Sequence, residues 1–224
     1  MKSYRIGKTL RESRLPVAFE GLPFILVGGI ITALFFYGGL LFAAIPMGIM
    51  SLFTLFFFRD PERRIGTQAN AVLTPADGKI LNISHLKDSN NPLGEPGVKV
   101  SIFMSIFNVH VNRVPIGGRV SEIVYTPGQF FSANLDKASE KNENNRIILE
   151  TDRGRKIVFV QIAGLIARRI VCWINEQDYV KAGQKCGLIR FGSRVDIYIP
   201  DDSRIIIQPR EKVKAGETII GYLS

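Results

Sequence analysis

The side chains that could carry chemistry are few in this chain of 224 residues. It has two histidines and two cysteines, without the spacing of a metal site, and no glycine-rich phosphate loop that leads into a helix. Neither a metal ion nor a nucleotide is therefore expected as a cofactor. Cys172 and Cys186 lie in apolar runs, which predicts ordinary packing in a reducing compartment.

Candidates for a nucleophile, a base and an acid can still be named. Ser193 follows Gly192, and a serine hydroxyl becomes a nucleophile when a base takes its proton. His85 lies in a short apolar strand and is predicted to be structural, and His110 is the other histidine, although a lone histidine is more often a packing residue than a catalyst. Asp77 precedes a glycine and, by itself, is most simply a turn residue. On their own these residues leave the chemistry open.

The segment that precedes these residues is apolar. Residues 21–58 contain no charged side chain, and as one helix they would extend ~57 Å, against ~30 Å for a hydrocarbon core. A turn at Gly38-Gly39 would give two halves that each cross once, so the run predicts a transmembrane helical hairpin. One long tilted helix, or a re-entrant segment that turns at Pro46, is the alternative.

Basic residues flank the apolar run on both sides. They are Lys2, Arg5, Lys8, Arg11 and Arg14 before it, and Arg59, Arg63 and Arg64 after it. The positive-inside rule then places both ends in the cytoplasm. We therefore expect a protein of the inner cell membrane, with residues 1–20 as a basic cytoplasmic N-terminus, 21–58 as the hairpin and 59–224 as a cytoplasmic β domain.

The charge of the chain agrees with a membrane setting. The whole chain has a net charge of +9, and residues 59–224 carry 24 Lys and Arg against 18 Asp and Glu, an excess of 6. This excess suits an anionic membrane surface. The basic residues are scattered rather than clustered with aromatic residues, so nucleic-acid binding is not expected.

From Asn70 onward, short runs of apolar and β-branched residues alternate with Gly, Pro, Asn and Asp, which is typical of an all-β domain. The predicted strands are Val98–Phe103, Arg119–Tyr125, Arg146–Glu150, Lys156–Ile162, Val195–Ile199 and Arg204–Gln208. Ser89–Gly97 is predicted to be a loop, and Ser132–Asn145 a polar loop or short helix.

Two turn sequences each occur twice. Pro75–Ile80 and Pro115–Val120 share the pattern Pro-x-x-Gly-basic-aliphatic, and Val180–Gln184 and Val213–Glu217 are nearly identical. Both pairs resemble the tight turns of biotinyl- and lipoyl-type barrel-sandwich domains. The predicted fold is therefore a mainly β, pseudo-symmetric barrel-sandwich. Glycine turns look alike in many all-β proteins, so the repeats inform the fold and not the chemistry.

Five motifs in one order point to a known family. They are Phe58–Arg63, Thr74–Gly78, Asn108–Pro115, the set Pro127–Phe130 with Lys137–Glu140 and Asn142-Glu143, and Leu188–Pro200. Together they resemble the phosphatidylserine decarboxylase proenzymes, a pyruvoyl-dependent family, in its short, archaeal-type branch. The resemblance covers essentially the whole chain.

The resemblance implies self-cleavage between Gly192 and Ser193, after which Ser193 becomes a covalent pyruvoyl cofactor. This group would form a Schiff base with the substrate amine and take up the electrons released with carbon dioxide. The resemblance matches His110 to the base and Asp77 to the acid that orients it, as in a Ser-His-Asp triad, and His110 would also protonate the product. Longer relatives have a second histidine where this chain has Arg113, so that proton transfer must be done otherwise.

The implied reaction converts phosphatidylserine in the bilayer to phosphatidylethanolamine, and the two cleaved chains would form a heterodimer. A homo-oligomer is left open. Arg59, Arg63 and Arg64 either hold lipid phosphates or only set the topology. Two alternatives are kept: a non-catalytic, membrane-tethered barrel-sandwich adaptor, for which an uncut chain would be evidence, and the same chemistry on another serine lipid.

Overall fold

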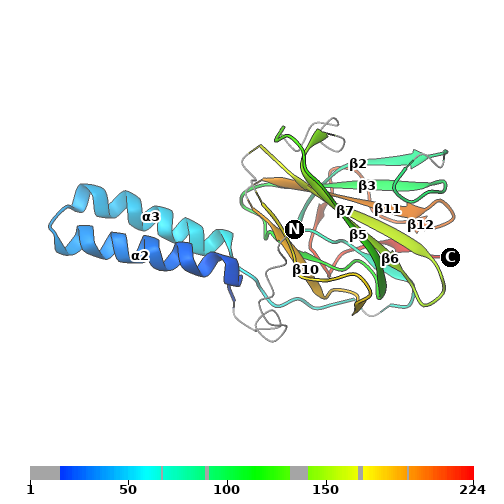
Figure 1. Cartoon of the computed structure of the whole chain (residues 1–224), viewed down its shortest axis with the longest axis horizontal. Coiled ribbons are helices and arrows are strands. Elements are labelled where there is room, and N and C mark those ends of the chain that lie inside the picture. Colours follow the sequence, from blue (N-terminus) through cyan, green and yellow to red (C-terminus); the bar gives the residue numbers. More distant parts are fainter. Residues whose placement is uncertain (1–15, 67, 89–90, 132–140, 166–168, 191) are drawn as a thin grey trace. The chain divides into compact units, whose positions relative to one another are not determined.

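The computed structural model describes residues 16–66, 68–88, 91–131, 141–165, 169–190 and 192–224. The chain divides into two compact units, residues 1–62 and 63–224 (Figure 1). The described part of the first unit is mainly helical and that of the second is mainly β, so the predicted class of a mainly β domain preceded by apolar helices is confirmed.

The apolar run forms a helical hairpin. A short 3-10 helix, η1 (Phe19–Gly21), leads into α2 (Leu22–Tyr37), and α3 (Leu41–Phe57) follows after a turn. The turn includes Gly39, which has a φ of +76°. The alternative of one long helix is wrong because the chain turns between α2 and α3. The alternative of a turn at Pro46 is wrong because α3 continues through this residue.

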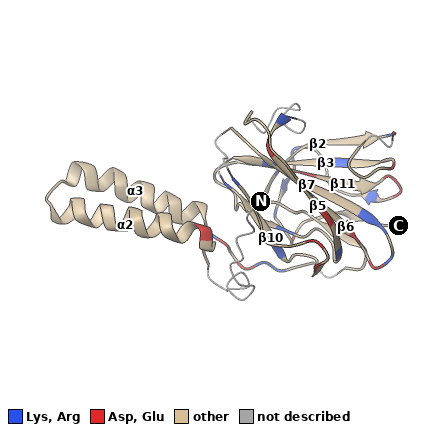
Figure 2. Ribbon diagram, viewed as in Figure 1, with Lys and Arg blue, Asp and Glu red and all other residues tan. Residues whose placement is uncertain are grey.

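Both helices are apolar on all sides. Figure 2 shows no Lys, Arg, Asp or Glu along α2 and α3. Phe19–Tyr37 is long and apolar enough to cross a membrane by length and composition, and Leu41–Phe57 is apolar with 17 residues. Where the helices meet, a Cβ added to Gly28 would lie 2.5 Å from Ser51 Oγ, so a small residue is needed for this close packing.

The described part of the second unit contains strands β1 to β14, and all of their pairings are antiparallel. Their bounds are β1 (Ala71–Leu73), β2 (Gly78–Leu86), β3 (Gly97–Met104), β4 (Val111–Arg113), β5 (Gly118–Thr126), β6 (Asn144–Glu150), β7 (Lys156–Ala163), β8 (Ile170–Cys172), β9 (Tyr179–Val180), β10 (Lys185–Ile189), β11 (Ser193–Pro200), β12 (Arg204–Ile205), β13 (Lys212–Val213) and β14 (Ile219–Tyr222). An eight-stranded curled sheet has the order β13-β2-β3-β11-β7-β6-β5-β9, and two three-stranded sheets have the orders β1-β14-β12 and β4-β10-β8 (Figure 1).

Most of the predicted strands are confirmed. β3, β5, β6, β7 and β11 match five predictions within two residues at each end, whereas Arg204–Gln208 is a strand only over Arg204–Ile205. The short apolar strand expected around His85 is part of β2, whose bounds were not predicted, and β10 and the short strands β1, β4, β8 and β14 were not expected. Since β6 begins at Asn144, the polar loop Ser132–Asn145 was predicted to end too late, and its residues 132–140 lie outside the described residues.

The repeated turns are related by an approximate two-fold symmetry. Leu73 N donates a hydrogen bond to Pro115 O at 2.8 Å, and Arg113 N donates to Pro75 O at 2.9 Å. Each Pro-x-x-Gly turn therefore bonds to the strand that precedes the other one. A shift of 40 residue numbers, from Pro75 to Pro115, carries one pattern onto the other.

The two Val-Lys-Ala-Gly turns obey the same symmetry. Gly183 and Gly216 both have a φ of +75°, a left-handed conformation that favours glycine. Their N–H groups donate to Val114 O at 2.8 Å and to Thr74 O at 2.9 Å. A Cβ added to Gly216 would lie 3.5 Å from Gly183 Cα, so the turns lie against each other. The pseudo-symmetry predicted from the repeats is confirmed.

The strand order separates two halves. The first half comprises β1 to β3 and β11 to β14, and the second comprises β4 to β10, inserted between β3 and β11. In the large sheet, β13-β2-β3-β11 of the first half corresponds to β9-β5-β6-β7 of the second. One apolar cluster draws on both halves, including Val100 and Ile102 from one and Ile147 and Leu149 from the other.

Candidate active site

Ser193 is the first residue of β11 and is completely buried. It pairs in register with Met104 at the end of β3 and with Ala163 at the end of β7. Its hydroxyl donates a hydrogen bond to Met104 Sδ at 3.3 Å. A thioether is a weak acceptor, so the serine proton is held weakly at a backbone position that is fixed from both sides.

Gly192 precedes the serine in a left-handed conformation, with a φ of +63°. A Cβ added to this residue would meet no described atom within 4 Å. Space therefore does not require glycine here. The backbone conformation does, because an L-residue with a side chain is strained at this φ.

His110 is completely buried at the end of the loop between β3 and β4. Its Nδ1 lies 2.9 Å from Asn108 O, and because a carbonyl oxygen only accepts, this bond requires a proton on Nδ1. In the neutral ring Nε2 is then the basic nitrogen. Asn108 is fixed in turn, since its Oδ1 accepts hydrogen bonds from Ser105 N at 2.9 Å and Ser105 Oγ at 2.8 Å. The loop thus presents the imidazole in one tautomer.

The loop that carries His110 and the start of β11 lie at the same end of the large sheet. The loop leaves β3 at Met104, which is the strand partner of Ser193. At its other end His110 O accepts a hydrogen bond from Ile189 N, four residues before Ser193, at 3.4 Å. The structure therefore brings the candidate nucleophile and the candidate base to one region.

Asp77 is buried at this end of the sheet as well. The adjoining Gly78 lies against β3, where an added Cβ would be 2.1 Å from Phe103 O. The Asp77 carboxylate accepts hydrogen bonds from Arg63 Nη2 at 2.8 Å and from Ala215 N at 2.7 Å. The carboxylate therefore joins the start of the β unit to one of the repeated turns.

Asp77 and His110 each have described hydrogen-bond partners of their own. Its two carboxylate oxygens accept bonds from Arg63 and Ala215, and the described Nδ1 bond of His110 goes to Asn108. The Asn108 carbonyl therefore orients the imidazole through Nδ1. A pairing of Asp77 with His110 during the reaction stays a prediction.

Arg113, which occupies the position of the missing second histidine, has a structural contact. Its guanidinium is buried and donates to Gly183 O at 3.0 Å, next to the facing Gly216 turn. Burial raises the pKa of the nearby Cys186 thiol well above its usual value, Cys172 raises it further and Arg113 opposes the shift. Cys186 is therefore a protonated thiol and does not compete as a nucleophile.

A chain of buried polar side chains that the sequence analysis missed leads away from Ser193. Met104 Sδ also accepts from Asn112 Nδ2 at 3.6 Å. Asn112 Oδ1 accepts from Gln161 Nε2 at 2.9 Å, and Gln161 Oε1 accepts from Asn145 Nδ2 at 3.0 Å. Asn112 and Gln161 are polar residues within apolar runs, and that is the signal that could have found them.

A buried ion pair follows Ser193 in the same strand. Arg194 Nε donates to Asp196 Oδ1 at 2.6 Å, and Arg194 Nη2 donates to Ser101 Oγ at 2.7 Å. Because side chains alternate along a strand, this pair lies on the face opposite to that of Ser193. The pair links the start of β11 to β3 on that face.

The pseudo-symmetry gives the site a counterpart at the other end of the sheet. Arg194 faces Phe103 as Lys156 faces Glu150, so the residues that precede Arg194 and Lys156 are equivalent. The equivalent positions are Ser193 and Arg155, His110 and Asn70, and Asp77 and Gly117.

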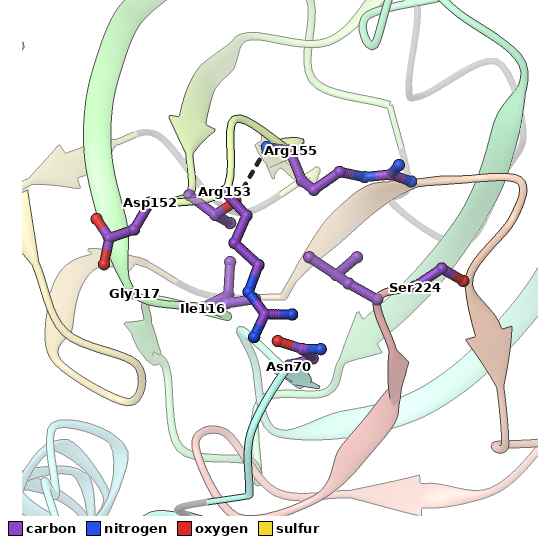
Figure 3. Close-up of a pocket in the computed structure, with 9 residues that line it drawn as sticks. Asn70, Ile116, Gly117, Asp152, Arg153, Arg155 and Ser224 are labelled. Carbon is purple, nitrogen blue, oxygen red and sulfur yellow. Dashed lines mark hydrogen bonds between the residues drawn. The ribbon is translucent and has the colours of Figure 1, made fainter.

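The counterpart residues line a surface pocket of about 170 Å³. Figure 3 shows Asn70, Gly117 and Arg155 around it, with the Arg153 side chain extending toward Asn70. A guanidinium here replaces the hydroxyl, and a carboxamide replaces the imidazole. The pocket therefore lacks a nucleophile and a base at the equivalent positions, and the candidate active site is the end that holds Ser193.

The fold and the site define a class of protein: a pseudo-symmetric β domain with a candidate serine nucleophile at a strand start, preceded by a left-handed glycine. Residues 50–221 match the family model described as Phosphatidylserine decarboxylase. The chain therefore belongs to the phosphatidylserine decarboxylase family, as the motifs predicted.

Individual relatives match over almost their whole length. The chain is 50% identical over 207 residues to the phosphatidylserine decarboxylase proenzyme of Syntrophus aciditrophicus, which covers 92% of this chain and 96% of the relative. It is 47% identical over 212 residues to that of Desulfotalea psychrophila, with 95% and 99% covered. It is 44% identical over 214 residues to that of Geotalea uraniireducens, with 96% and 100% covered. These relatives are about as short as this chain.

Proposed function

We propose that this chain is a proenzyme that cuts itself at Gly192-Ser193 and then decarboxylates phosphatidylserine to phosphatidylethanolamine at a membrane. The observation that carries the proposal is the buried Ser193 hydroxyl, directly after a glycine with a φ of +63°, in a chain of this family. Family membership favours the enzyme over the alternative of a non-catalytic adaptor.

The cleavage begins with the serine hydroxyl. Ser193 Oγ attacks the carbonyl carbon of Gly192, and the peptide bond is exchanged for an ester through an N→O shift of the acyl group. Glycine adopts the left-handed backbone at position 192 without strain, and its lack of a side chain leaves the carbonyl carbon open to attack. The weak bond to Met104 Sδ costs little to break when Ser193 Oγ turns toward the carbonyl.

His110 is the proposed base. The bond from its Nδ1–H to Asn108 O leaves Nε2 to take the proton of the Ser193 hydroxyl. Asp77 contributes a negative charge at the same end of the sheet, which favours the imidazolium that forms. Removal of the Ser193 α-proton then expels the Gly192 carboxylate, and water releases ammonia, which leaves the pyruvoyl group on the new N-terminus.

The residues present fit a pyruvoyl group at position 193. This position lies between β3 and β7, with the buried Met104 and Ala163 on either side of it. The group supplies an electrophilic carbonyl that binds the substrate amine and takes up the electron pair released with carbon dioxide. His110 is the proposed donor of the proton that replaces the carboxylate.

The two cleaved chains are proposed to stay together as a heterodimer. β11 belongs to the small chain after cleavage, and it pairs with β3 over eight positions and with β7 over six. β14 of the same chain pairs with β1. The small chain therefore contributes a central strand, and its release would break the large sheet.

The helical hairpin is proposed to cross the inner cell membrane, with the β unit on the cytoplasmic face. The support is the apolar outer surface of α2 and α3 and the basic residues on both sides of the run. Arg63 is not available to a lipid phosphate, because its guanidinium is bonded to Asp77. Protease added to oriented inner-membrane vesicles should degrade the β unit only from the cytoplasmic side.

The mass of the intact full-length protein tests the proposal. We expect two chains, residues 1–192 and a 32-residue chain (224−192) that begins with pyruvoyl in place of Ser193. The same preparation should release carbon dioxide from phosphatidylserine in detergent micelles, and Ser193→Ala should give one uncut chain without activity. A single uncut mass in active protein would overturn the proposal, and activity on an ether-linked serine lipid would identify the other substrate.

A further inference from the structure

Two large apolar side chains are exposed beside the candidate active site. Phe107 is 63% exposed and Leu165 is 64% exposed. Among the described residues of the β unit, these are the large hydrocarbon side chains with more than half of their surface in solvent. Exposed apolar side chains that lie close together on a folded domain often mark a site of interaction with a protein or a membrane.

Both side chains lie on loops that leave the strand partners of Ser193. Phe107 comes three residues after Met104, and Leu165 comes two residues after Ala163. Neighbouring strands are ~4.8 Å apart, so Met104 and Ala163 lie on either side of Ser193 at that spacing. The two apolar side chains therefore stand on opposite sides of the end of β11. Together with Arg169, we call them the apolar rim.

Arg169 adds a positive charge to the rim. It is exposed and lies four residues after Leu165, at the start of the segment that leads into β8. Its carbonyl accepts a hydrogen bond from Arg190 N at 3.2 Å, which places it next to the segment that runs to Ser193. Large apolar side chains beside an exposed arginine are typical of surfaces at the boundary between lipid headgroups and acyl chains.

We propose that Phe107 and Leu165 insert into a bilayer that contains anionic lipid, with Arg169 against the headgroups, so that the Ser193 end of the sheet is held at the membrane surface. The proposal rests on the proposed function in that the substrate is a bilayer lipid. The occupant is a lipid surface rather than a protein because the charge on the rim is complementary to anionic headgroups. The hairpin would then hold the chain in the membrane, while the rim would orient the site.

Tryptophan fluorescence tests insertion without requiring activity. The chain has one tryptophan, so Phe107→Trp and Leu165→Trp are made with Trp173→Phe in the full-length protein. The proteins are placed in nanodiscs whose phosphatidylcholine has brominated acyl chains, with or without phosphatidylglycerol. The matched control is Tyr179→Trp, since Tyr179 is 75% exposed and pairs in register with Arg119, which faces Glu150 at the opposite end of the sheet.

The expected result is at least twofold quenching at positions 107 and 165 in the anionic discs and none at position 179. Quenching no stronger than that of the control would overturn the proposal. Equal quenching in discs without phosphatidylglycerol would overturn the choice of anionic lipid. Because this signal does not depend on turnover, a protein that inserts its rim but releases no carbon dioxide would refute the proposed function and leave the rim intact.

Kinetics give a second, independent measurement. Phe107→Ser and Leu165→Ser should each raise KM for phosphatidylserine in anionic discs about tenfold, with little change in kcat. KM for a short-chain phosphatidylserine dissolved as monomers should change less than twofold, because no bilayer is involved. An equal rise in both KM values would show that these side chains contact the substrate itself, and it would overturn the proposal. Tyr179→Ser should leave both KM values unchanged.

Discussion

The two ends of the large sheet have the same framework and different connections. At one end β6 and β7 are joined by a tight turn, in which Thr151 N donates to Arg155 O at 2.9 Å and Gly154 has a φ of +72°. At the equivalent end β3 and β11 are not joined directly, because the whole second half of the domain is inserted between them. The Gly192-Ser193 bond lies where the chain returns from this insertion.

The absence of a direct turn between β3 and β11 makes the start of β11 accessible to another loop. The tight turn between β6 and β7 is closed by its own backbone hydrogen bonds, so no other loop can reach the start of β7. Where the hairpin is opened, the first residue of β11 is still fixed by β3 and β7, and the loop after Met104 can bring His110 to it. Cleavage at this point cuts a connection and not a strand, so the framework can survive it.

Replacement of the nucleophile should have the largest effect on cleavage, and replacement of the equivalent residue at the other end of the sheet should have none. Ser193→Ala should abolish self-cleavage and activity, because the hydroxyl is both the nucleophile and the precursor of the ketone. Arg155→Ala, at the equivalent position, should cleave like wild type. The measurement is the intact mass of each purified protein. A cut Ser193→Ala chain, or an uncut Arg155→Ala chain, would break the comparison.

Replacement of the proposed base, His110, should have the second-largest effect on cleavage. His110→Asn introduces the residue type found at the equivalent position 70, and it should slow cleavage by about 10²–10⁴, the usual contribution of a positioned general base. Because each molecule cuts itself once, the measurement is a time course after pulse-labelled synthesis. His85→Ala is the control, since His85 is exposed and pairs with Asp201 at 3.2 Å. Cleavage of His110→Asn at the wild-type rate would exclude His110 as the base.

The framework could be predicted because its signals are local. The repeated turns contain glycines at positions where the backbone is left-handed, and such a requirement is visible in a few consecutive residues. The full length of β2 was not predicted because its buried positions do not alternate regularly, as a register shift between Ile80 and Asn82 interrupts the pairing with β3. The hairpin was predicted because a bilayer imposes a length on each helix.

The partners of the site residues could not be predicted in the same way. Asp77 is bonded to Ala215, which is 138 positions away in sequence, and to Arg63 from the start of the β unit. The group that orients His110 is a backbone carbonyl, which every residue has, so no residue type could identify it. Such contacts depend on the whole fold, whereas the motifs identified only which side chains are present.

Removal of the Asp77 charge should have a smaller effect on cleavage and a clear effect on stability. Asp77→Asn removes the nearer of the two carboxylates that pair with the buried Arg63 side chain, Asp77 at 2.8 Å against Glu217 at 3.8 Å. Breaking a buried pair on one side costs about 3 kcal/mol of unfolding free energy, and the remaining contact with Glu217 sets this figure as the upper limit here. Cleavage should slow by more than tenfold, because the imidazolium of His110 is less stabilised. The measurements are thermal unfolding of the uncut protein and the pulse-labelled time course.

A double variant separates the two effects of Asp77. Asp77→Asn with Arg63→Gln removes both charges and should recover most of the lost stability, since the buried cation is gone and Glu217 keeps its contact with Lys214 at 3.8 Å. We expect cleavage to stay slow in the double variant, because the charge near His110 is still absent. Recovery of the wild-type cleavage rate would show that Asp77 acts only by holding Arg63.

Two glycines give the finest test of the comparison, with the smallest expected effect. Gly192 and Gly154 have φ values of +63° and +72°, and a Cβ added to either would meet no described atom within 4 Å. Alanine at either position should therefore cost a similar 1–2 kcal/mol, roughly the penalty of the left-handed conformation, when unfolding is measured in uncut Ser193→Ala protein. With Ser193 restored, Gly192→Ala should slow cleavage severalfold, because the backbone at the attacked carbonyl relaxes toward a conformation that alanine prefers, whereas Gly154→Ala should cleave at the wild-type rate. If both variants lost the same stability and both cleaved normally, the left-handed glycine before Ser193 would be a feature of the fold alone, and its backbone conformation would have no part in the cleavage.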